Sequence, residues 1–281
     1  MDIKNVLVVG GGTMGRDIAI VIAEAGVNVK IADISPEATG KAIIMIGQRL
    51  DKRIEKKELD SAKKPDILAL IKPGALRDAS DADLVIEAVF EDFKVKSDIF
   101  KQLGALCPKN TILATNTSAL SITKIAEVVP APERVIGLHF FNPVIKMLLV
   151  EIIRTKTTSA EVFAGVRDFI SKVGKSPVEV KEYPGFIVNR LLIPMINEAI
   201  GMLSDGVAEK EAIDTAMKLG AAHPLGPLAL SDMIGLDVCL NIMRILEKDL
   251  NDKKYHPAPL LEEMVKQGKL GRKTKEGFYK Y

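Results

Sequence analysis

Several features are scarce in this 281-residue sequence, and each scarcity argues against a class of protein. The two cysteines, Cys107 and Cys239, lie far apart and lack metal-ligand spacing, which favours buried thiols in a reducing compartment over a metal site. No uninterrupted apolar stretch reaches the ~20 residues of a membrane span. The formal net charge is only +2, which argues against a nucleic-acid-binding surface as the main function.

The length and composition predict a soluble globular protein. Apolar residues make up 47% of the chain and charged residues 27%. A chain of 281 residues suits one large or two modest domains with a substantial buried core. The first strand-like run begins at Ile3, which leaves no room for a signal or transit segment. We therefore expect a cytoplasmic protein without a membrane or nucleic-acid partner.

The apolar run Ile3–Val9 leads directly into a glycine-rich turn, GGGTMG, and then into a candidate helix, Met14–Ala25. A G-x-G-x-x-G turn between a strand and a helix lets the backbone approach a pyrophosphate and directs a helix N-terminus at its charge. The pattern alone is also compatible with an ordinary tight turn. The turn residues expected to contact a dinucleotide are Gly10, Gly12, Thr13, Met14 and Gly15.

A second apolar run, Val27–Ala32, ends at Asp33, about twenty residues beyond the glycines. A carboxylate at this place can accept hydrogen bonds from an adenosine ribose. It would also repel a 2′-phosphate, and no arginine follows it closely. The sequence therefore predicts NAD rather than NADP as the cofactor, with Asp33 among its contacts.

Strand-like and helical patterns alternate up to about residue 182, and only helical patterns follow. The alternation is typical of parallel βαβ units, so we predict an α/β fold with a Rossmann-type doubly wound sheet over 1–182 and an all-α domain over 183–281. The further predicted strands are Asp83–Val89, Thr111–Thr115, Arg134–Phe140, Leu148–Ile153 and Ser176–Val180. The predicted helices of the second part are Phe186–Leu203, Glu209–Leu219, Leu228–Asp249 and Pro259–Gln267.

Polar residues stand at the ends of two predicted strands, where an open α/β sheet binds its ligands. Thr111–Thr115 continues into Asn116, Thr117 and Ser118, and Arg134–Phe140 contains His139 and leads to Asn142. A nicotinamide dehydrogenase needs a base for the hydroxyl proton, and histidine suits that role. His139 is therefore a candidate base, although a hydrogen-bonded core histidine would look the same in the sequence.

The two other histidines are poorer candidates. His223 and His256 each precede a proline, which favours extended or turn conformations and a structural role. Glu151 strengthens the case for His139, because a carboxylate in an apolar run needs a partner. A histidine would suit it. Alternatively, Glu151 faces solvent on an edge strand or pairs with Arg154. Asn189, at the start of the helical part, either caps a helix or closes over the site.

A basic stretch on the long helical pattern after Pro36 offers a different signal. Arg49, Arg53 and Lys56 follow i, i+4, i+7 spacing, which aligns three cations along one helix face. Interspersed acidic residues make a solvated face the simpler interpretation. The functional alternative is a binding surface for a phosphorylated part of the substrate.

The combined motifs resemble the 3-hydroxyacyl-CoA dehydrogenase family, in particular its short, single-function 3-hydroxybutyryl-CoA type. The resemblance covers essentially the whole chain. It includes the glycine turn and the motifs EAVFEDFKVK (Glu87–Lys96), ATNTSAL (Ala114–Leu120), GLHFFNPV (Gly137–Val144), YPGFIVNRLL (Tyr183–Leu192), HPLGPLALSDMIGLD (His223–Asp237) and GFYKY (Gly277–Tyr281).

The resemblance implies an NAD-dependent oxidoreductase acting on acyl-CoA thioesters, and a homodimer formed through the helical domain. It implies that His139 is the base, Glu151 its partner, and Ser118 and Asn189 the residues that position the reacting group. The cofactor contacts that it implies include Asp33, Glu91, Lys96, Asn116, Ser118, Asn142 and Lys273. A lysine that contacts CoA in the family corresponds to Lys56, which favours the functional interpretation of the basic stretch, with Arg49 and Arg53 beside it.

Some positions depart from the family pattern. Ile145–Leu148 replaces the Pro-Val-Met-Lys that usually follows the pair Pro143-Val144, which affects the local loop and the substrate fit. Arg49 stands where the family has a serine. Two rival hypotheses remain. A β-hydroxyacid dehydrogenase would carry a lysine four residues before Asn189, but this chain has Gly185 there. The other rival is a non-catalytic, NAD-binding, crystallin-like protein.

Overall fold

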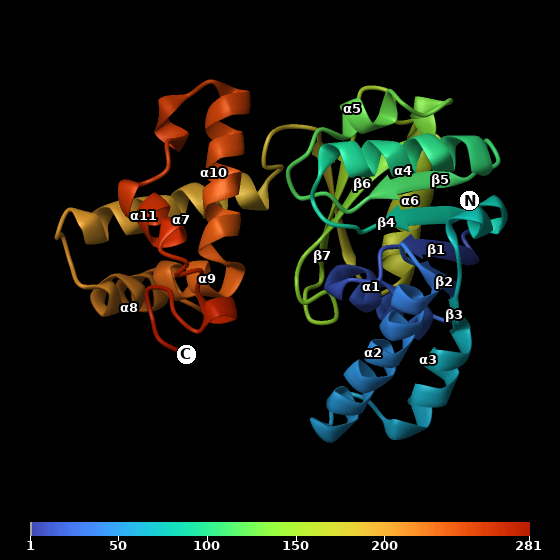
Figure 1. The fold of residues 1–281 in the computed structure, drawn as a ribbon, viewed down its shortest axis with the longest axis horizontal. Coiled ribbons are helices and arrows are strands. Elements are labelled where there is room, and N and C mark those ends of the chain that lie inside the picture. Colours follow the sequence, from blue (N-terminus) through green and yellow to red (C-terminus); the bar gives the residue numbers. More distant parts are fainter. Residues whose placement is uncertain (1) are drawn as a thin grey trace. The chain divides into compact units, whose positions relative to one another are not determined.

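The computed structural model describes residues 2–281, which divide into two compact units. The first unit ends at Glu182, and the second comprises Tyr183–Tyr281. The first carries the β-sheet, whereas the second is built from helices (Figure 1). The predicted α/β class, with a Rossmann-type sheet followed by an all-helical region, is confirmed.

The sheet of the first unit has the strand order β3-β2-β1-β4-β5-β6-β7-β8. Neighbouring strands are parallel, except that β7 runs antiparallel to β6. The order reverses between β1 and β4, and open α/β sheets bind ligands outside the strand ends at such a reversal. The strands are β1 Asn5–Val9, β2 Asn28–Ala32, β3 Ile71–Pro73, β4 Leu84–Glu87, β5 Ile112–Thr115, β6 Val135–Phe140, β7 Leu149–Arg154 and β8 Ser176–Lys181.

The helices of this unit begin at signals that the sequence carries. Ser35 accepts a hydrogen bond from the Ala38 amide at the start of α2, where Pro36 occupies the first helical position. By contrast, α1 begins after Gly12 and has no side-chain cap, so its first amides are open to an anionic ligand. The helices are α1 Thr13–Glu24, α2 Pro36–Glu55, α3 Lys64–Leu70, α4 Phe93–Leu106, α5 Ile122–Ala126 and α6 Ala160–Lys172.

The central strands are buried on both faces, because side chains alternate along a strand and every residue of β4, β5 and β6 is buried. The helix α1 contributes Ile18, Ile20 and Ile22 to the same core, each fully buried. Burial of each such side chain stabilises the fold by about 1.5–3 kcal/mol. A rigid scaffold therefore lies beneath the strand ends.

The second unit contains one break that the sequence pattern does not predict. The single helix predicted over Leu228–Asp249 is wrong: α9 ends at Ile234, α10 begins at Leu236, and Gly235 between them has a φ of 107°. Only glycine adopts such a φ readily, so the chain turns there. The helices are α7 Val188–Ser204, α8 Lys210–Gly220, α9 Pro227–Ile234, α10 Leu236–Leu250 and α11 Pro259–Lys266.

The first unit also differs from the sequence-based expectation in two places. The alternation predicts parallel βαβ units, but β7 is antiparallel to β6, and the sequence pattern does not predict the short elements α3 and β3. Both cysteines are buried and free, as predicted, and burial raises the pKa of Cys107 to about 11 and that of Cys239 to about 12. Within residues 2–281, no helix is both long and apolar enough to cross a membrane.

Candidate active site

The glycine turn lies between the end of β1 and the start of α1, and its backbone is tightly packed. A Cβ at Gly10 would lie 2.6 Å from the Ala88 carbonyl oxygen, and one at Gly15 would lie 1.8 Å from the Gly10 carbonyl oxygen. At Gly12, by contrast, a Cβ would meet nothing within 4 Å. The turn therefore presents backbone to open space beside the uncapped start of α1, as pyrophosphate binding requires. Thr13 and Met14 are the first residues of that helix.

Asp33 follows β2 and is tied to the glycine turn. One carboxylate oxygen accepts a hydrogen bond from the Gly11 amide at 2.6 Å, and the other accepts one from the Ile34 amide at 2.6 Å. The Thr39 hydroxyl, in the first turn of α2, accepts a hydrogen bond from the Asp33 amide and so fixes the position of Asp33. The carboxylate is thus held beside the turn and keeps lone pairs for further donors. These residues fit a dinucleotide with an unphosphorylated ribose.

His139 and Glu151 face each other across the antiparallel pair β6 and β7, where they occupy opposed register positions. The His139 Nδ1 atom lies 2.7 Å from a Glu151 carboxylate oxygen. His139 is 5% exposed and Glu151 is fully buried. The alternative partner for Glu151 is ruled out, because Arg154 pairs with Glu179 instead. Phe141 packs against the imidazole, with ring centroids 4.4 Å apart.

Asn116 joins the ends of β5 and β6, because its side-chain oxygen accepts a hydrogen bond of 2.9 Å from the Phe140 amide. The next residues along the chain converge on Glu91, from the loop after β4. One Glu91 oxygen accepts hydrogen bonds from the Thr117 hydroxyl, the Ser118 amide and hydroxyl, and the Ala119 amide, at 2.5–3.2 Å. Of the predicted residues, Glu91, Asn116, Ser118 and His139 therefore lie at the same edge of the sheet.

Lys96, which the family resemblance implies as a cofactor contact, is only 1% exposed. Its ammonium donates to Glu87 at 2.6 Å and to the Val89 carbonyl at 3.3 Å, and it lies 3.5 Å from Glu91. Glu87 was not among the residues predicted from the sequence, although a carboxylate within an apolar strand is the same signal that identified Glu151.

The loop that carries Asn142 is anchored by a second buried lysine, which the sequence-based predictions also missed. Lys175 donates to the carbonyls of Val144 and Met147 at 2.5 and 2.9 Å, and burial lowers its pKa. Asn142 precedes Pro143 through a cis peptide bond. The residues that depart from the family pattern, Ile145–Leu148, therefore lie in a loop whose backbone is fixed by hydrogen bonds from Lys175.

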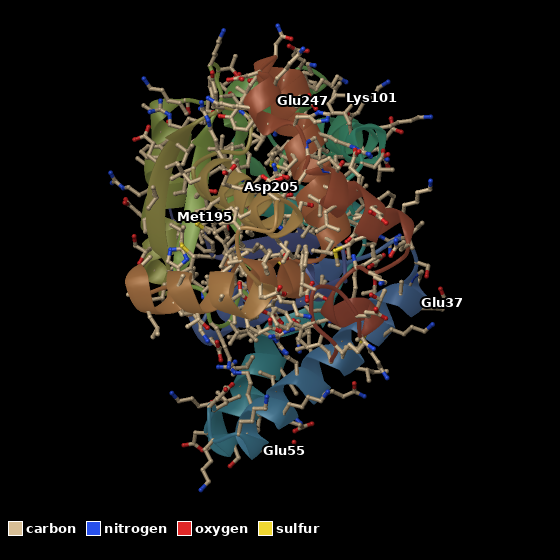
Figure 2. The ribbon with its side chains drawn as sticks, turned by 90° about the vertical axis from the view of Figure 1, so that its left-hand side faces the viewer. Glu37, Glu55, Lys101, Met195, Asp205 and Glu247 are labelled. Atoms are coloured by element: carbon tan, nitrogen blue, oxygen red, sulfur yellow. The ribbon has the colours of Figure 1, made fainter. Side chains whose placement is uncertain are left out.

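The basic stretch on α2 is largely paired within the protein. Arg49 lies 3.1 Å from Asp17, and Arg53 lies 2.6 Å from Glu24, both on α1. Lys56 directly follows Glu55, which is labelled at the end of α2 in Figure 2, and it is exposed. The three predicted cations are thus unequal, because Arg49 and Arg53 are held by carboxylates of α1 whereas Lys56 is exposed to solvent at the helix end.

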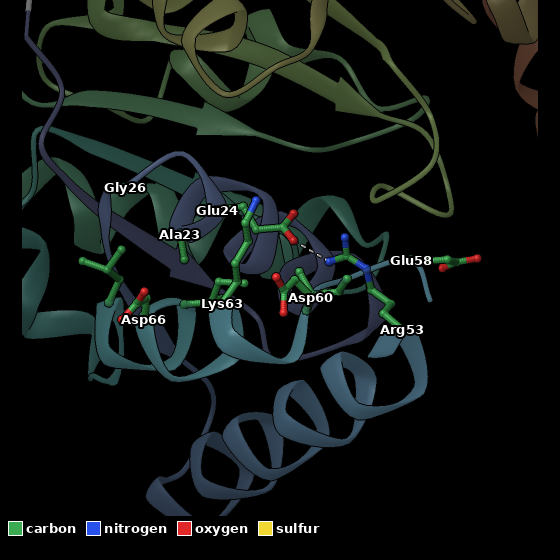
Figure 3. A pocket seen from close by; sticks show the side chains of 11 residues that line it. Ala23, Glu24, Gly26, Arg53, Glu58, Asp60, Lys63 and Asp66 are labelled. Atoms are coloured by element: carbon green, nitrogen blue, oxygen red, sulfur yellow. Dashed lines mark hydrogen bonds and ion pairs between the residues drawn. The ribbon is translucent and has the colours of Figure 1, made fainter. Parts of the chain in front are cut away.

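A cavity of about 490 Å³ lies beside Arg53, between the end of α1, the end of α2 and α3 (Figure 3). Its charged lining consists of Arg53 and Lys63 together with Glu24, Glu58, Asp60 and Asp66. With four carboxylates against two cations, this cavity does not favour a phosphate group. None of the residues at the strand ends lines it.

Two predicted residues belong to the second unit. Asn189 is the second residue of α7, and the Lys273 ammonium lies 2.5 and 2.6 Å from the two Asp237 carboxylate oxygens. Gly185 has a φ of 75°, and a Cβ there would lie 2.8 Å from the Leu246 side chain. A lysine four residues before Asn189 would therefore be strained, which argues further against a β-hydroxyacid dehydrogenase.

Comparisons with known proteins match both units. Residues 5–183 match the model of the 3-hydroxyacyl-CoA dehydrogenase NAD binding domain, and residues 185–281 match the model of the C-terminal domain of the same enzymes. The 3-hydroxybutyryl-CoA dehydrogenase of Clostridioides difficile is 50% identical over 98% of each chain. The human mitochondrial hydroxyacyl-coenzyme A dehydrogenase is 43% identical over 99% of this chain and 91% of its own length.

Solved structures agree with the sequence comparisons. The crystal structure of (S)-3-hydroxybutyryl-CoA dehydrogenase from Ralstonia eutropha has a TM-score of 0.96 and 48% identity, and the match covers 100% of this chain and 99% of that one. The prediction of NAD as the cofactor is confirmed by the matched NAD binding domain and by these relatives.

Proposed function

Because the chain belongs to the 3-hydroxyacyl-CoA dehydrogenase family and is therefore an NAD-dependent oxidoreductase, we propose that it interconverts (S)-3-hydroxyacyl-CoA and 3-oxoacyl-CoA. 3-Hydroxybutyryl-CoA is the preferred substrate. The observation that carries the proposal is the buried contact of 2.7 Å between His139 and Glu151 at the strand-end edge. The names of relatives such as that from Clostridioides difficile support the four-carbon acyl chain.

In the oxidative direction, His139 accepts the proton of the substrate 3-hydroxyl. Glu151 is an acceptor when ionised, so its contact with Nδ1 places the imidazole proton on that atom and makes Nε2 the nitrogen that takes up the substrate proton. When His139 becomes an imidazolium, the adjacent carboxylate stabilises the new charge, because both side chains are buried and the attraction is weakly screened. Glu151 therefore orients the base and stabilises its charged form.

Two further residues hold the reacting oxygen. Ser118 stands after β5, where its hydroxyl lies 3.2 Å from Glu91. Its proposed role is to contact both the substrate hydroxyl and the cofactor. Asn189, near the start of α7, donates its side-chain amide to the same oxygen. Hydrogen-bond donors in fixed positions orient the reacting carbon and oxygen of the substrate relative to His139 and the cofactor, and such orientation is a large part of catalysis.

NAD would be held by the glycine turn, with contacts at Gly10, Gly12, Thr13, Met14 and Gly15, and by Asp33 at the ribose. Further contacts would come from Glu91, Lys96, Asn116, Ser118, Asn142 and Lys273. The uncapped start of α1 would bind the pyrophosphate of NAD through its free backbone amides. When bound, NAD supplies the acceptor for the hydride that leaves the substrate carbon. The protein contributes binding, orientation and the movement of the proton.

The proposed function is tested by mixing the purified protein with acetoacetyl-CoA and NADH and following NADH absorbance. We expect rapid NADH consumption, and the highest kcat/KM with the four-carbon thioester when thioesters of increasing acyl length are compared. Intact NADH binding without consumption would instead support the non-catalytic, crystallin-like protein.

We predict that Lys56 contacts a CoA phosphate. Lys56→Glu is expected to raise KM for the CoA thioester several-fold with little change in kcat, because an exposed ion pair is worth about 0.2–1 kcal/mol and charge reversal adds repulsion. The neighbouring exposed residue provides the matched control, Lys57→Glu. A truncated pantetheine thioester lacks the phosphates, so its KM should not respond. An equal rise in KM for both substrates would show that this basic stretch is a solvated helix face and does not bind the CoA phosphates.

The second unit serves dimerisation and closure of the substrate site. This unit leaves large apolar side chains exposed, including Leu191 at 71%, Val207 at 62% and Leu219 at 82%, which supports a homodimer formed through it. Light scattering at micromolar concentration should therefore give twice the mass of the chain, and a monomeric mass would contradict the assignment.

A further inference from the structure

Glu87 is a fully buried carboxylate at the last position of β4. One of its oxygens accepts hydrogen bonds from the Val89 amide at 2.7 Å and from Lys96 at 2.6 Å. Its other oxygen accepts the Thr115 hydroxyl at 2.7 Å, from the end of the adjacent strand β5. Glu87 therefore joins the ends of two neighbouring strands and the first turn of α4.

Lys96 links Glu87 to a second carboxylate, Glu91, which is partly exposed. Its ammonium lies between Glu87, at 2.6 Å, and Glu91, at 3.5 Å. Glu91 in turn accepts hydrogen bonds from the loop after β5, including those from the Ser118 and Ala119 amides. A chain of three charges, Glu87, Lys96 and Glu91, thus connects the interior of the sheet to Ser118.

Stability alone does not explain these charges. Burial of an ion pair costs desolvation that apolar side chains of similar volume would avoid, and such replacements are often neutral or stabilising. The preceding residues of β4, Val85 and Ile86, are apolar and equally buried. A carboxylate at the last position, where the strand meets the site, therefore suits a role in orienting the loops at the strand ends.

We propose that Glu87 is a positioning residue, which through Lys96 and Glu91 sets the loop that carries Ser118. Lys96 belongs to the same arrangement. The inference rests on the proposed function in one respect, because Ser118 must act in the site for its position to affect the reaction. The geometry of the loop can be measured independently of activity.

The first test is the Glu87→Gln variant, which keeps the shape and removes the charge. Misplacement of a reacting group by about 1 Å can cost ~10²-fold, so we expect kcat to fall by ~10²-fold while KM changes much less. Amide hydrogen exchange at Ser118 and Ala119 should become faster, whereas exchange in β1 should remain as in the parent. NADH affinity, followed by its fluorescence, should weaken several-fold at most.

A milder pair of variants covers the case in which Glu87→Gln does not fold. Thr115 and Thr111 are both buried, at opposite ends of the same stretch. The Thr115 hydroxyl donates to Glu87 and accepts a weaker hydrogen bond of 3.3 Å from the Thr117 amide, whereas the Thr111 hydroxyl donates to the Ala82 carbonyl. Thr115→Val should accelerate exchange at Ser118 and lower kcat several-fold. Thr111→Val loses a comparable bond far from the loop and should leave both unchanged.

The double variant Glu87→Gln with Lys96→Met separates positioning from stability. Either single change leaves a buried charge without its nearest counterion, and the double variant removes that charge, so Tm should recover. Glu91 still lacks its cation in the double variant, so kcat should stay low. Recovery of both kcat and Tm would overturn the proposal, as would exchange at Ser118 that is unchanged in Glu87→Gln and Thr115→Val. A parent without dehydrogenase activity would refute the proposed function, while the exchange rates would still decide whether Glu87 sets the loop.

Discussion

Replacing His139 with glutamine is expected to lower kcat by about 10²–10⁴-fold, which is the usual contribution of a positioned general base. Glutamine is of similar size and still hydrogen-bonds, but it cannot accept the substrate proton. The glycine turn and Asp33 lie on other elements than His139, so the NADH dissociation constant should remain close to that of the parent. A combination of lost turnover and intact binding would locate the defect in the chemistry.

The second unit supplies a matched control for this experiment. His256 lies 2.9 Å from Glu247, the same kind of pair as His139 with Glu151, but it is exposed on the surface. His256→Gln should therefore retain parental kcat. The two variants are compared by steady-state kinetics with acetoacetyl-CoA and by NADH fluorescence titration. A His139→Gln enzyme with near-parental kcat would refute the proposed mechanism.

The parts of the fold and site that the sequence predicts are those with local signals. The glycine turn, the acid at the end of β2 and the strand ends beside Asn116 and His139 follow from short motifs between apolar runs. The family resemblance is confirmed along the whole chain. Residues whose roles depend on a contiguous motif can therefore be placed from the sequence alone.

The parts that could not be predicted depend on contacts distant in sequence. Nothing in the pattern of α2 shows that Arg49 and Arg53 face acidic residues of α1, because helix packing decides it. The direction of β7 likewise depends on the pairing of its backbone with β6. Lys175 follows a glycine in an ordinary polar context, and only the fold brings it beneath Val144.

Glu87 and Glu151 carry the same sequence signal, but the basic partner can be identified from the sequence only for Glu151. Both are carboxylates within apolar strands, and both are fully buried with a basic partner. The partner of Glu151 is a histidine at a strand end, which is a candidate base in its own right. The partner of Glu87 lies nine residues further along, among other lysines of a helix. A buried acid at a strand end therefore predicts a partner even when none is obvious.

Replacing Glu151 with glutamine is expected to lower kcat by about 10–10²-fold. The amide oxygen can still accept the proton on Nδ1 of His139, so the ring keeps its orientation, but the neutral amide cannot stabilise the imidazolium. Hydrogen bonds to charged groups are worth about 1.5–3 kcal/mol, and each ~1.4 kcal/mol is a factor of ten in rate. Glu151→Ala loses orientation as well and should be slower than Glu151→Gln.

The double variant shows whether the pair acts as a unit. If Glu151 works only through His139, then His139→Gln with Glu151→Gln should be no slower than His139→Gln alone, since residues of one catalytic unit are not additive. Glu247→Gln, which alters the exposed pair of His256, should retain parental kcat. Rates that multiply in the double variant would show that the buried carboxylate acts independently of the histidine, and the dyad would then have to be abandoned.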